Sequence, residues 1–228
     1  MQTLSQADFE QLIAGAKVLE RQDGGLSALK TPDNRLIKVW QRRGGLSSDR
    51  IRPYSKRFAD NCRRLNERGI PAPVIQERFR IRETGEHVLI YPLLPGLSLD
   101  KVAKQGELPV EELAGLYARL HQAGVLFRSI HLGNVLQLDD GRLGLIDVTD
   151  CWFFSRPLGS RFRAQNIGYA WEYRGDHVHF TDAVRRQMLE VYLDEANLGR
   201  RKTRRFKAEL EDALAHYDAR RKKRAAHS

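Results

Sequence analysis

The sequence predicts an α+β protein in which a small, strand-rich N-terminal part with one helix precedes a mainly helical C-terminal part. In the first part, short apolar runs alternate with Gly, Pro, Asn and Asp turn signals, as in a small sheet. After "PGLSL" the apolar residues recur at helical spacing instead. We therefore expect a first part over residues 1–94, a second over 95–199, and a basic C-terminal helix and tail over 200–228.

The predicted strands of the first part are bounded by turns. "AKVLER" and "LSALKT" flank the hairpin-type turn "QDGG", and "RLIKVWQ" follows the turn "PDN". "VIQERFRIRE" and "HVLIYPLL" flank the turn "TGE". Between these two groups we expect one helix that ends at Gly69. Its predicted apolar face comprises Tyr54, Phe58, Cys62 and Leu65.

The second part begins with a predicted helix in "LPVEELAGLYARLHQAG", with Pro109 near its start and Gly124 at its end. Two short strands, "NVLQL" and "RLGLID", follow and are joined by the turn "DDG". A loop is expected up to about residue 180, and then a helix capped by Thr181 or Asp182 that runs to about Leu198. The last helix is expected near 204–219. Its apolar face comprises Phe206, Leu210, Leu214 and Tyr217.

The composition is typical of a protein that works in a reducing, aqueous compartment. The chain contains no apolar run of about 18 residues, the length that a membrane-spanning helix needs. Its N-terminus lacks the basic start and apolar core of a signal peptide. Cys62 and Cys151 are the only cysteines, too few for a disulfide framework or a zinc cluster. We therefore expect a cytoplasmic protein.

The chain is basic, with a net charge of +10 that is unevenly distributed. Residues 200–228 hold eleven Lys and Arg against four Asp and Glu, and a second basic region runs from Lys38 to Arg68. Such regions attract nucleotide phosphates, acidic lipids, lipopolysaccharide phosphates or nucleic acid. A solubilising surface with a frayed tail explains the C-terminal charges equally well.

The pair Asn134 and Asp147 is the most specific chemical feature of the chain. The two residues stand 13 positions apart, with the predicted strand–turn–strand between them. Mg²⁺ prefers oxygen ligands in octahedral geometry, and one amide oxygen plus one carboxylate leave positions for phosphate and water. Each residue alone is common in turns and at strand ends, so the predicted metal site depends on the pair in this context.

The order of a strand-rich part, a joint and a helical part with this hairpin resembles the protein-kinase-like two-lobe fold over roughly residues 15–198. The resemblance implies an N-terminal nucleotide-binding lobe and a C-terminal catalytic lobe. It also implies ATP, with Mg²⁺ held by Asn134 and Asp147. The segment "IYPLLPG" falls where such proteins join their lobes. Asp147 is followed by Val148 and Thr149, so the Phe-Gly half of the family's D-F-G motif is missing, as is common in small-molecule and lipopolysaccharide kinases.

The same resemblance assigns the nucleotide contacts of the first part. Lys38 in "RLIKVW" matches the lysine that contacts the α- and β-phosphates. Gly24 and Gly25 fall where backbone amides cover the phosphates, although an ordinary hairpin turn is an equal alternative. The helix offers Asp60 or Asn61, and no Glu, as the partner of Lys38.

The loop "FRSIHLGN" departs from that family at the position of its catalytic Asp. It resembles the form H-x-D-L-H-P-G-N of aminoglycoside-type and related small-molecule kinases, with His131 on the second His and Ser129 on the Asp. A serine orients a hydroxyl group but does not accept its proton as a carboxylate does. His131, Asp150 or the substrate itself is therefore a candidate base, and a structural role for His131 in the loop is the alternative.

Residues 151–180 are rich in aromatic residues and arginines, and kinases place their activation and substrate segment here. We expect the aromatic run Trp152, Phe153 and Phe154 to pack under the loop. The candidates for contact with a phosphorylated substrate are Arg156, Arg161 and Arg163.

The whole chain is similar to the bacterial lipopolysaccharide kinase group, which includes Kdo and core-heptose kinases and small toluene-tolerance and InaA-like proteins. The similarity implies transfer of phosphate to a sugar hydroxyl of a lipopolysaccharide core or a related envelope molecule, with the basic tail in peripheral contact with the inner membrane face. Because Ser129 breaks the motif, a pseudokinase that binds or regulates a partner is the alternative. Nucleic-acid binding by the tail ranks last, because no aromatic residues are interleaved there.

Overall fold

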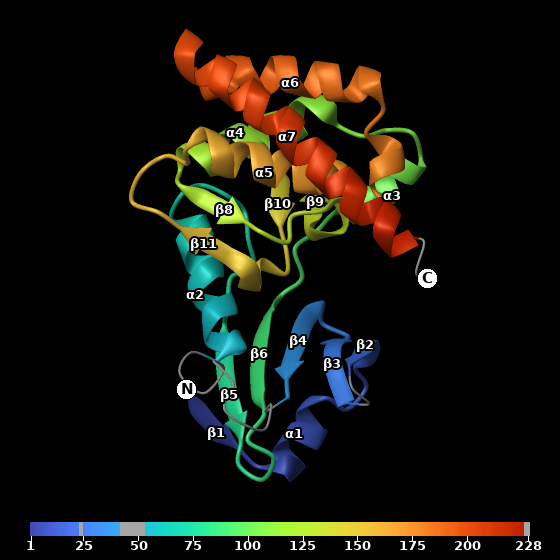
Figure 1. Ribbon diagram of the computed structural model, residues 1–228. Helices are drawn as coiled ribbons and strands as arrows, with labels where there is room; N and C mark the ends of the chain where they lie inside the picture. Colours follow the sequence, from blue (N-terminus) through green and yellow to red (C-terminus); the bar gives the residue numbers. More distant parts are fainter. Residues whose placement is uncertain (23–24, 42–52, 226–228) are drawn as a thin grey trace. The chain divides into compact units, whose positions relative to one another are not determined.

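The computed structural model describes residues 1–22, 25–41 and 53–225 (Figure 1). The chain forms two compact units, Met1–Pro95 and Gly96–Ser228. The first unit is built on a β-sheet and the second is mainly helical, so the chain is a mixed protein with a sheet-bearing N-terminal part, as the sequence predicts. The C-terminal helix belongs to the second unit.

The first unit contains a six-stranded sheet with the strand order β1-β5-β6-β4-β3-β2. Its strands are β1 (Gln2–Leu4), β2 (Lys17–Gln22), β3 (Gly25–Lys30), β4 (Arg35–Trp40), β5 (Glu77–Ile81) and β6 (His87–Pro92). β1 pairs with β5 in parallel, and the other neighbours are antiparallel. The predicted strands are all present. β1 was not predicted, because three residues are too few to show an alternating pattern.

One face of this sheet forms an apolar core with α1 (Gln6–Leu12). The buried members of this core are Phe9, Leu29, Ile37, Val39, Ile81, Val88 and Ile90. Helix α1 begins with a capping box, in which the Ser5 hydroxyl accepts from the Asp8 N–H at 3.1 Å and the Asp8 carboxylate accepts from the Ser5 N–H. The expectation of a single helix in the first part was therefore wrong. The sequence did not predict α1 because this helix buries only Phe9, and a single buried residue cannot show a helical repeat of apolar positions.

The opposite face of the sheet packs against α2 (Tyr54–Asn66). Residues two apart on a strand share a face, so Lys38 and Trp40 both point toward this helix. The Phe58 ring of α2 lies 5.4 Å from the Trp40 ring, and Cys62 and Leu65 are buried on the same side of the helix. The predicted buried stripe of this helix is confirmed at these positions.

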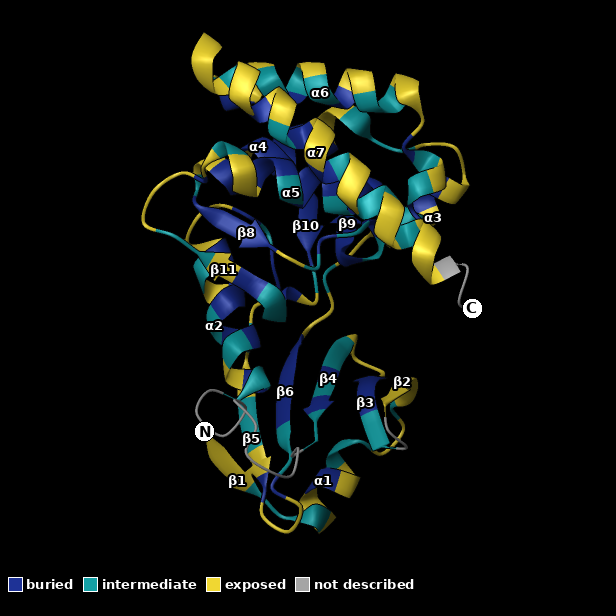
Figure 2. Ribbon diagram, in the orientation of Figure 1, coloured by how far each residue is buried: buried dark blue, intermediate teal, exposed yellow. Residues whose placement is uncertain are grey.

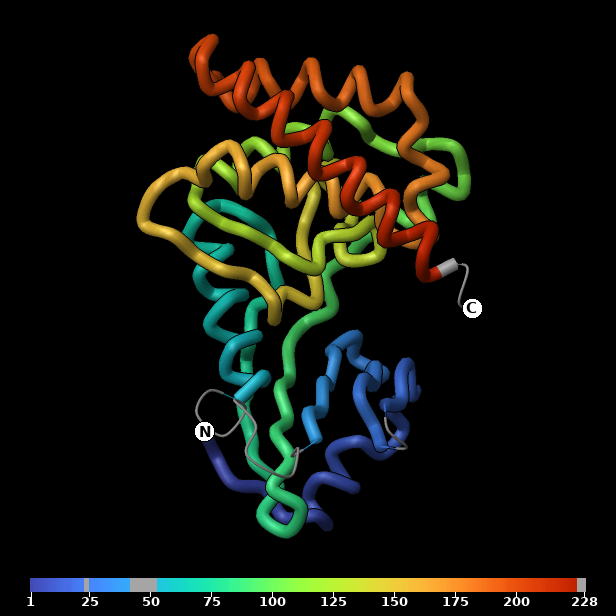
Figure 3. Tube along the Cα trace, in the orientation of Figure 1, coloured from blue at the N-terminus to red at the C-terminus, as the bar shows by residue number. Residues whose placement is uncertain are grey.

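The four longer helices of the second unit pack in pairs. The α-helices of this unit are α3 (Leu99–Lys104), α4 (Val110–Gln122), α5 (Ser160–Trp171), α6 (Asp182–Ala196) and α7 (Arg200–Ala225). α4 packs against α6 and α5 packs against α7 (Figures 1 and 3). α4 and α5 are largely buried, while α7 keeps a long exposed face (Figure 2). Of the two predicted caps, Thr181 is the one that caps α6, since its hydroxyl accepts from the Val184 N–H at 3.4 Å.

The structure corrects the predicted loop before residue 180, because this segment contains a strand and the whole of α5. α5 buries the polar side chains of Arg163 and Asn166 beside Ala164 and Ile167, so its apolar residues alone do not reveal the helical period. α7 also extends beyond the predicted 204–219, because the Arg, Lys and Ala residues at both ends favour helix.

Two small ladders hold the loops of the second unit. Their strands are β7 (Leu97–Ser98), β8 (Val125–Phe127), β9 (Val135–Gln137), β10 (Leu143–Leu145) and β11 (Cys151–Phe153). One ladder has the order β10-β9-β7, and β8 pairs with β11 in the other. The strands predicted around the "DDG" turn are confirmed as the β9–β10 hairpin.

Within the described ranges, no helix is both long and apolar enough to cross a lipid bilayer.

Candidate functional site

Asn134 lies at the start of the β9–β10 hairpin and is held by the loop before it. Its side-chain Nδ2 donates to the main-chain oxygen of Ser129 at 2.9 Å, and its own N–H donates to the His131 oxygen at 2.9 Å. Its main-chain oxygen accepts from the Ile146 N–H at 3.0 Å. Because Nδ2 is engaged with the loop, Oδ1 is the end of the amide that can accept a further bond.

Asp147 follows Ile146 at the same end of the hairpin. Leu145 pairs with Val135, so the hairpin returns the chain to Asn134, as the 13-residue spacing predicts. Asp147 has φ 53° and ψ 37°, a left-handed conformation that is uncommon for residues other than glycine. It is exposed. Such conformations cost free energy and concentrate at functional sites, which makes Asp147 a candidate functional residue.

Ser129 lies in the loop after β8, next to an ion pair. The Arg128 N–H donates to the main-chain oxygen of Asp150 at 3.1 Å, and Arg128 Nη1 lies 3.4 Å from Asp150 Oδ1. Asp150, one of the candidate bases, is thus engaged by the residue that precedes Ser129.

The imidazole of His131 is fixed by its neighbours. Its ring stacks on the Tyr173 ring at a centroid distance of 4.4 Å and an interplanar angle of 5°. Its Nδ1 accepts from the Gly133 N–H at 3.2 Å. Burial lowers the pKa of His131, and the carboxylates of Asp176 and Asp100 oppose that shift. Since Nδ1 caps the turn that leads to Asn134, the geometry supports the structural role that the sequence left open.

Asp176 is a site residue that sequence reasoning missed. Its Oδ2 accepts from the Leu132 N–H at 2.6 Å, which ties the segment after α5 to the loop 44 residues earlier. Burial raises the pKa of Asp176, and the bond from Leu132 counteracts the rise. No local pattern marks this aspartate, because its role depends on a contact distant in sequence.

A buried polar network supports the strand before the loop. Asn166 Nδ2 donates to the main-chain oxygen of Phe127 at 2.8 Å, and its Oδ1 accepts from His121 Nε2 at 3.1 Å. The Tyr192 hydroxyl donates to His121 Nδ1 at 2.9 Å. Burial lowers the pKa of His121 to about 3, so the ring is neutral at ordinary pH. The network fixes α4, α5 and α6 around β8.

Arg163 belongs to this network and does not face a substrate. It is 3% exposed, and it donates from Nε to the Leu158 oxygen at 2.7 Å and from Nη1 to the Tyr192 hydroxyl at 3.0 Å. The prediction that Arg163 meets a phosphorylated substrate was therefore wrong. Arg156 and Arg161, the other two candidates, are exposed.

Trp152 contradicts the expectation that the aromatic run packs under the loop. Its side chain is 48% exposed, while Phe153 and Phe154 are half-buried. Only tertiary structure separates these three adjacent positions.

Lys38 in the first unit lies in an aromatic environment. Its Nζ lies 5.3 Å from the Phe58 ring centroid and 5.6 Å from that of Trp40. Burial lowers the pKa of Lys38, and the negative charge of Glu20 opposes this shift. Glu20 and Lys38 share a face because both pair with Ala28, whose small side chain lies between them.

Glu20 is therefore an acidic neighbour of Lys38 that sequence reasoning missed. That Asp60 or Asn61 is the helix partner of Lys38 stays a prediction. Gly25 opens β3 opposite Gln22, which places it in a β2–β3 hairpin, and Gly24 lies outside the described residues.

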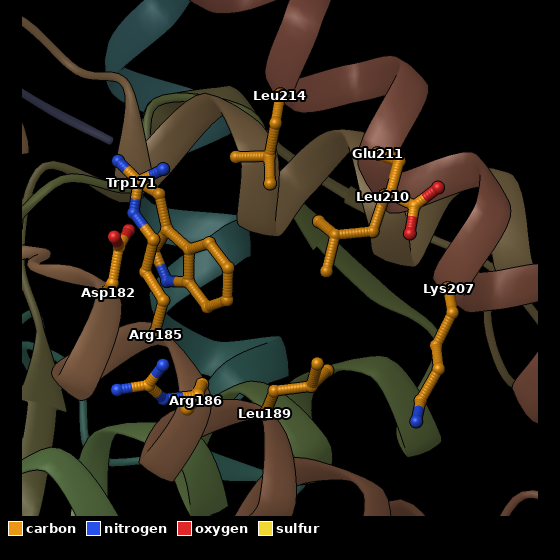
Figure 4. A pocket seen from close by; sticks show the side chains of 9 residues that line it. All are labelled: Trp171, Asp182, Arg185, Arg186, Leu189, Lys207, Leu210, Glu211 and Leu214. Atoms are coloured by element: carbon orange, nitrogen blue, oxygen red, sulfur yellow. The ribbon is translucent and has the colours of Figure 1, made fainter.

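Among the described residues, no group of three or more His, Cys, Asp and Glu side chains could hold a metal ion. A cavity of about 390 Å³ lies between α6 and α7. Its apolar lining is Trp171, Leu189, Leu210 and Leu214 (Figure 4). None of the predicted site residues lines it.

No protein-family model and no curated protein sequence matches the chain. Similar solved structures include the bifunctional kinase-methyltransferase WbdD, with 16% identity and a TM-score of 0.43 over 80% of this chain and 46% of that one. Monomeric WbdD has 14% identity and a TM-score of 0.48 over 81% of this chain and 44% of that one. The chain thus spans less than half the length of these structures. Identities this low say nothing about shared chemistry.

Proposed function

We propose that the chain is an ATP- and Mg²⁺-dependent phosphotransferase of the protein-kinase-like class, with its site at Ser129, Asn134 and Asp147. One observation carries the proposal. Asn134 is bonded to the Ser129 oxygen through Nδ2 and to Ile146 through its main-chain oxygen, directly before the left-handed Asp147. This arrangement supports a site in which the Asp147 carboxylate and the Asn134 amide oxygen act together at one end of a short hairpin.

The donor set fits Mg²⁺ held between protein and nucleotide. Asp147 and the Oδ1 of Asn134 would supply two oxygen ligands, and phosphate and water would supply the rest. The ion would neutralise charge on the phosphates. In the first unit, Lys38 is the proposed contact to the nucleotide phosphates. The backbone amides at Gly24 and Gly25 are proposed to cover the same phosphates.

Ser129 stands where a carboxylate base is usual, and the Nδ1 of His131 already accepts a backbone N–H. Transfer would then depend on Ser129 orienting the acceptor hydroxyl, with the acceptor's proton passing to water or to the substrate. General-base help is typically worth about 10²–10⁴-fold, whereas phosphoryl transfer depends mainly on positioning and charge. A slow enzyme is expected.

The proposed acceptor is a sugar hydroxyl of a lipopolysaccharide core or a related envelope molecule, on the cytoplasmic side of the inner membrane. The family resemblance of the loop and hairpin supports this acceptor. The exposed basic residues of α7 support a peripheral contact with that membrane face.

Calorimetric titration with ATP, with and without Mg²⁺, tests the proposal on the wild type and on Asp147→Asn. We expect Mg²⁺-dependent binding that Asp147→Asn abolishes. Asp140→Asn is the matched control, since Asp140 lies in the turn of the same hairpin and pairs with Arg142. The absence of ATP binding by the wild type, or equal binding by wild type and Asp147→Asn, contradicts the proposal.

A pseudokinase that binds a partner is the second candidate, favoured by Ser129 and by the engaged Nδ1 of His131. Ser129→Asp discriminates between the two. A slow phosphotransferase should gain at least tenfold in turnover when a carboxylate is restored at this position. A site kept only for binding should gain no transfer activity.

A further inference from the structure

A surface of aromatic rings and arginines adjoins the loop that carries Ser129. The members of this aromatic–arginine surface are Trp152, Phe154, Phe162, Arg128, Arg156 and Arg161. Trp152 is 48% exposed and Phe162 is 40% exposed. Single exposed apolar residues are ordinary, but a contiguous exposed group next to a candidate site suggests a binding surface.

The aromatic members form a continuous group. Trp152 and Phe154 are two residues apart in an extended segment, so they project on the same side. The Phe154 N–H donates to the Gly124 oxygen at 2.8 Å, which continues the β8–β11 ladder past its last assigned pair. The Phe154 ring lies 5.4 Å from the ring of Phe162, in the first turn of α5. Strand and helix thus contribute to one apolar surface.

Arginines lie next to these rings in space or in sequence. The Arg128 guanidinium lies 4.8 Å from the centroid of the Trp152 ring. Its contact with Asp150 is long, at 3.4 Å, and half-exposed, so a stronger anion can compete for it. Arg156 and Arg161 are exposed, and neither has a carboxylate partner in the described part of the chain. Guanidinium groups bind phosphate and carboxylate in a bidentate manner.

Aromatic faces carry negative electrostatic potential and attract the weakly positive C–H groups of a sugar ring. Rings and unpaired arginines together match a sugar that bears a phosphate or carboxylate group. Arg128 joins this surface to Ser129, its neighbour in sequence. We propose that the aromatic–arginine surface binds an anionic sugar, and that this sugar is the acceptor. Binding is independent of the proposed phosphotransfer, whereas the acceptor role depends on it.

The test measures binding of glucose 6-phosphate in the absence of ATP. Saturation-transfer NMR on the sugar ring protons detects the binding, and glucose serves for comparison. We expect binding of the phosphorylated sugar only, and at least about tenfold weakening in Trp152→Ala and in the double variant Arg156→Ala/Arg161→Ala. Trp152→Phe keeps a ring and should retain most of the affinity. The control Arg200→Ala/Arg204→Ala removes the same charge from exposed positions of α7 and should change affinity less than twofold.

Equal weakening in the two arginine pairs would overturn the proposal, because it would indicate attraction by net charge alone. No binding to the wild type would overturn it as well. A membrane contact is a third outcome that would overturn it. In that case the wild type binds no sugar but binds vesicles of 30% phosphatidylglycerol in phosphatidylcholine, and Trp152→Ala loses the vesicle binding. Failure of ATP to bind leaves this assay unaffected, so the two proposals fail separately.

Discussion

Arg161 and Arg163 stand two residues apart on α5, and the structure places them in opposite environments. Arg163 is 3% exposed and donates to the Leu158 oxygen and the Tyr192 hydroxyl. Arg161 is exposed, and no described carboxylate pairs with it. The basic charge of this chain therefore has two separate uses. Part of it holds helices together inside the second unit, and part is available to anions at the surface.

Both environments converge on β8. On its buried side the Phe127 oxygen accepts from Asn166, within the network of His121 and Tyr192. Directly after β8, on the exposed side of this part of the unit, Arg128 lies over Trp152 and beside Asp150. The loop with Ser129 begins where these two sides meet. The buried network therefore holds the loop in position, and Arg128, Trp152 and Asp150 on the exposed side form its surroundings.

Replacing Arg163 should have the largest effect on stability. Arg163→Ala leaves the Leu158 oxygen and the Tyr192 hydroxyl without their donor and opens a void, so we expect a loss of about 3 kcal/mol in the free energy of unfolding. Arg161→Ala, its matched control, should change that free energy by less than about 0.5 kcal/mol. Urea denaturation measures both. Similar losses in the two variants would show that the buried and exposed arginines are not distinct.

Acid should weaken the buried side through His121. Its pKa is about 3 in the folded protein against ~6.5 when unfolded, so the unfolded chain alone takes up this proton as the pH falls from ~6.5 toward 3. The free energy of unfolding should therefore fall with pH in that window, by up to ~1.4 kcal/mol per unit from this group.

Urea denaturation at pH 7, 6 and 5 measures this dependence on the wild type and on His121→Gln. The variant should be less stable at pH 7. The slope of its free energy of unfolding against pH should be smaller by the contribution of about one proton. An unchanged slope would mean that His121 is protonated in the folded protein, against its bonds to Asn166 and Tyr192.

The exposed side should contribute least to stability. The Arg128–Asp150 pair is half-exposed, and such pairs are typically worth about 0–1 kcal/mol. Asp150→Asn should therefore lower the free energy of unfolding by less than about 1 kcal/mol in the same denaturation assay. A loss above about 2 kcal/mol would place this pair with the structural network.

Sequence patterns predicted the elements whose apolar residues repeat cleanly. The strands around "QDGG" and "TGE", the helices α2, α4 and α6, and the β9–β10 hairpin all follow from local periodicity and turn residues. α1 and α5 were missed for a physical reason. α1 buries a single side chain, and α5 fills its inner face partly with Arg163 and Asn166, which read as surface residues.

The sequence by itself determined that Asn134 and Asp147 stand at the same end of a hairpin, because a turn of fixed length between two short strands returns the chain to its start. It also determined that a helix begins near Thr181 and Asp182, and the structure selects Thr181 as the cap. Only the tertiary structure decided that Arg163 is buried, that Trp152 is exposed, and that Asp176 binds Leu132 from 44 residues away. These outcomes depend on how α4, α5 and α6 pack around β8, and a residue's own type and neighbours do not specify which of its faces that packing covers.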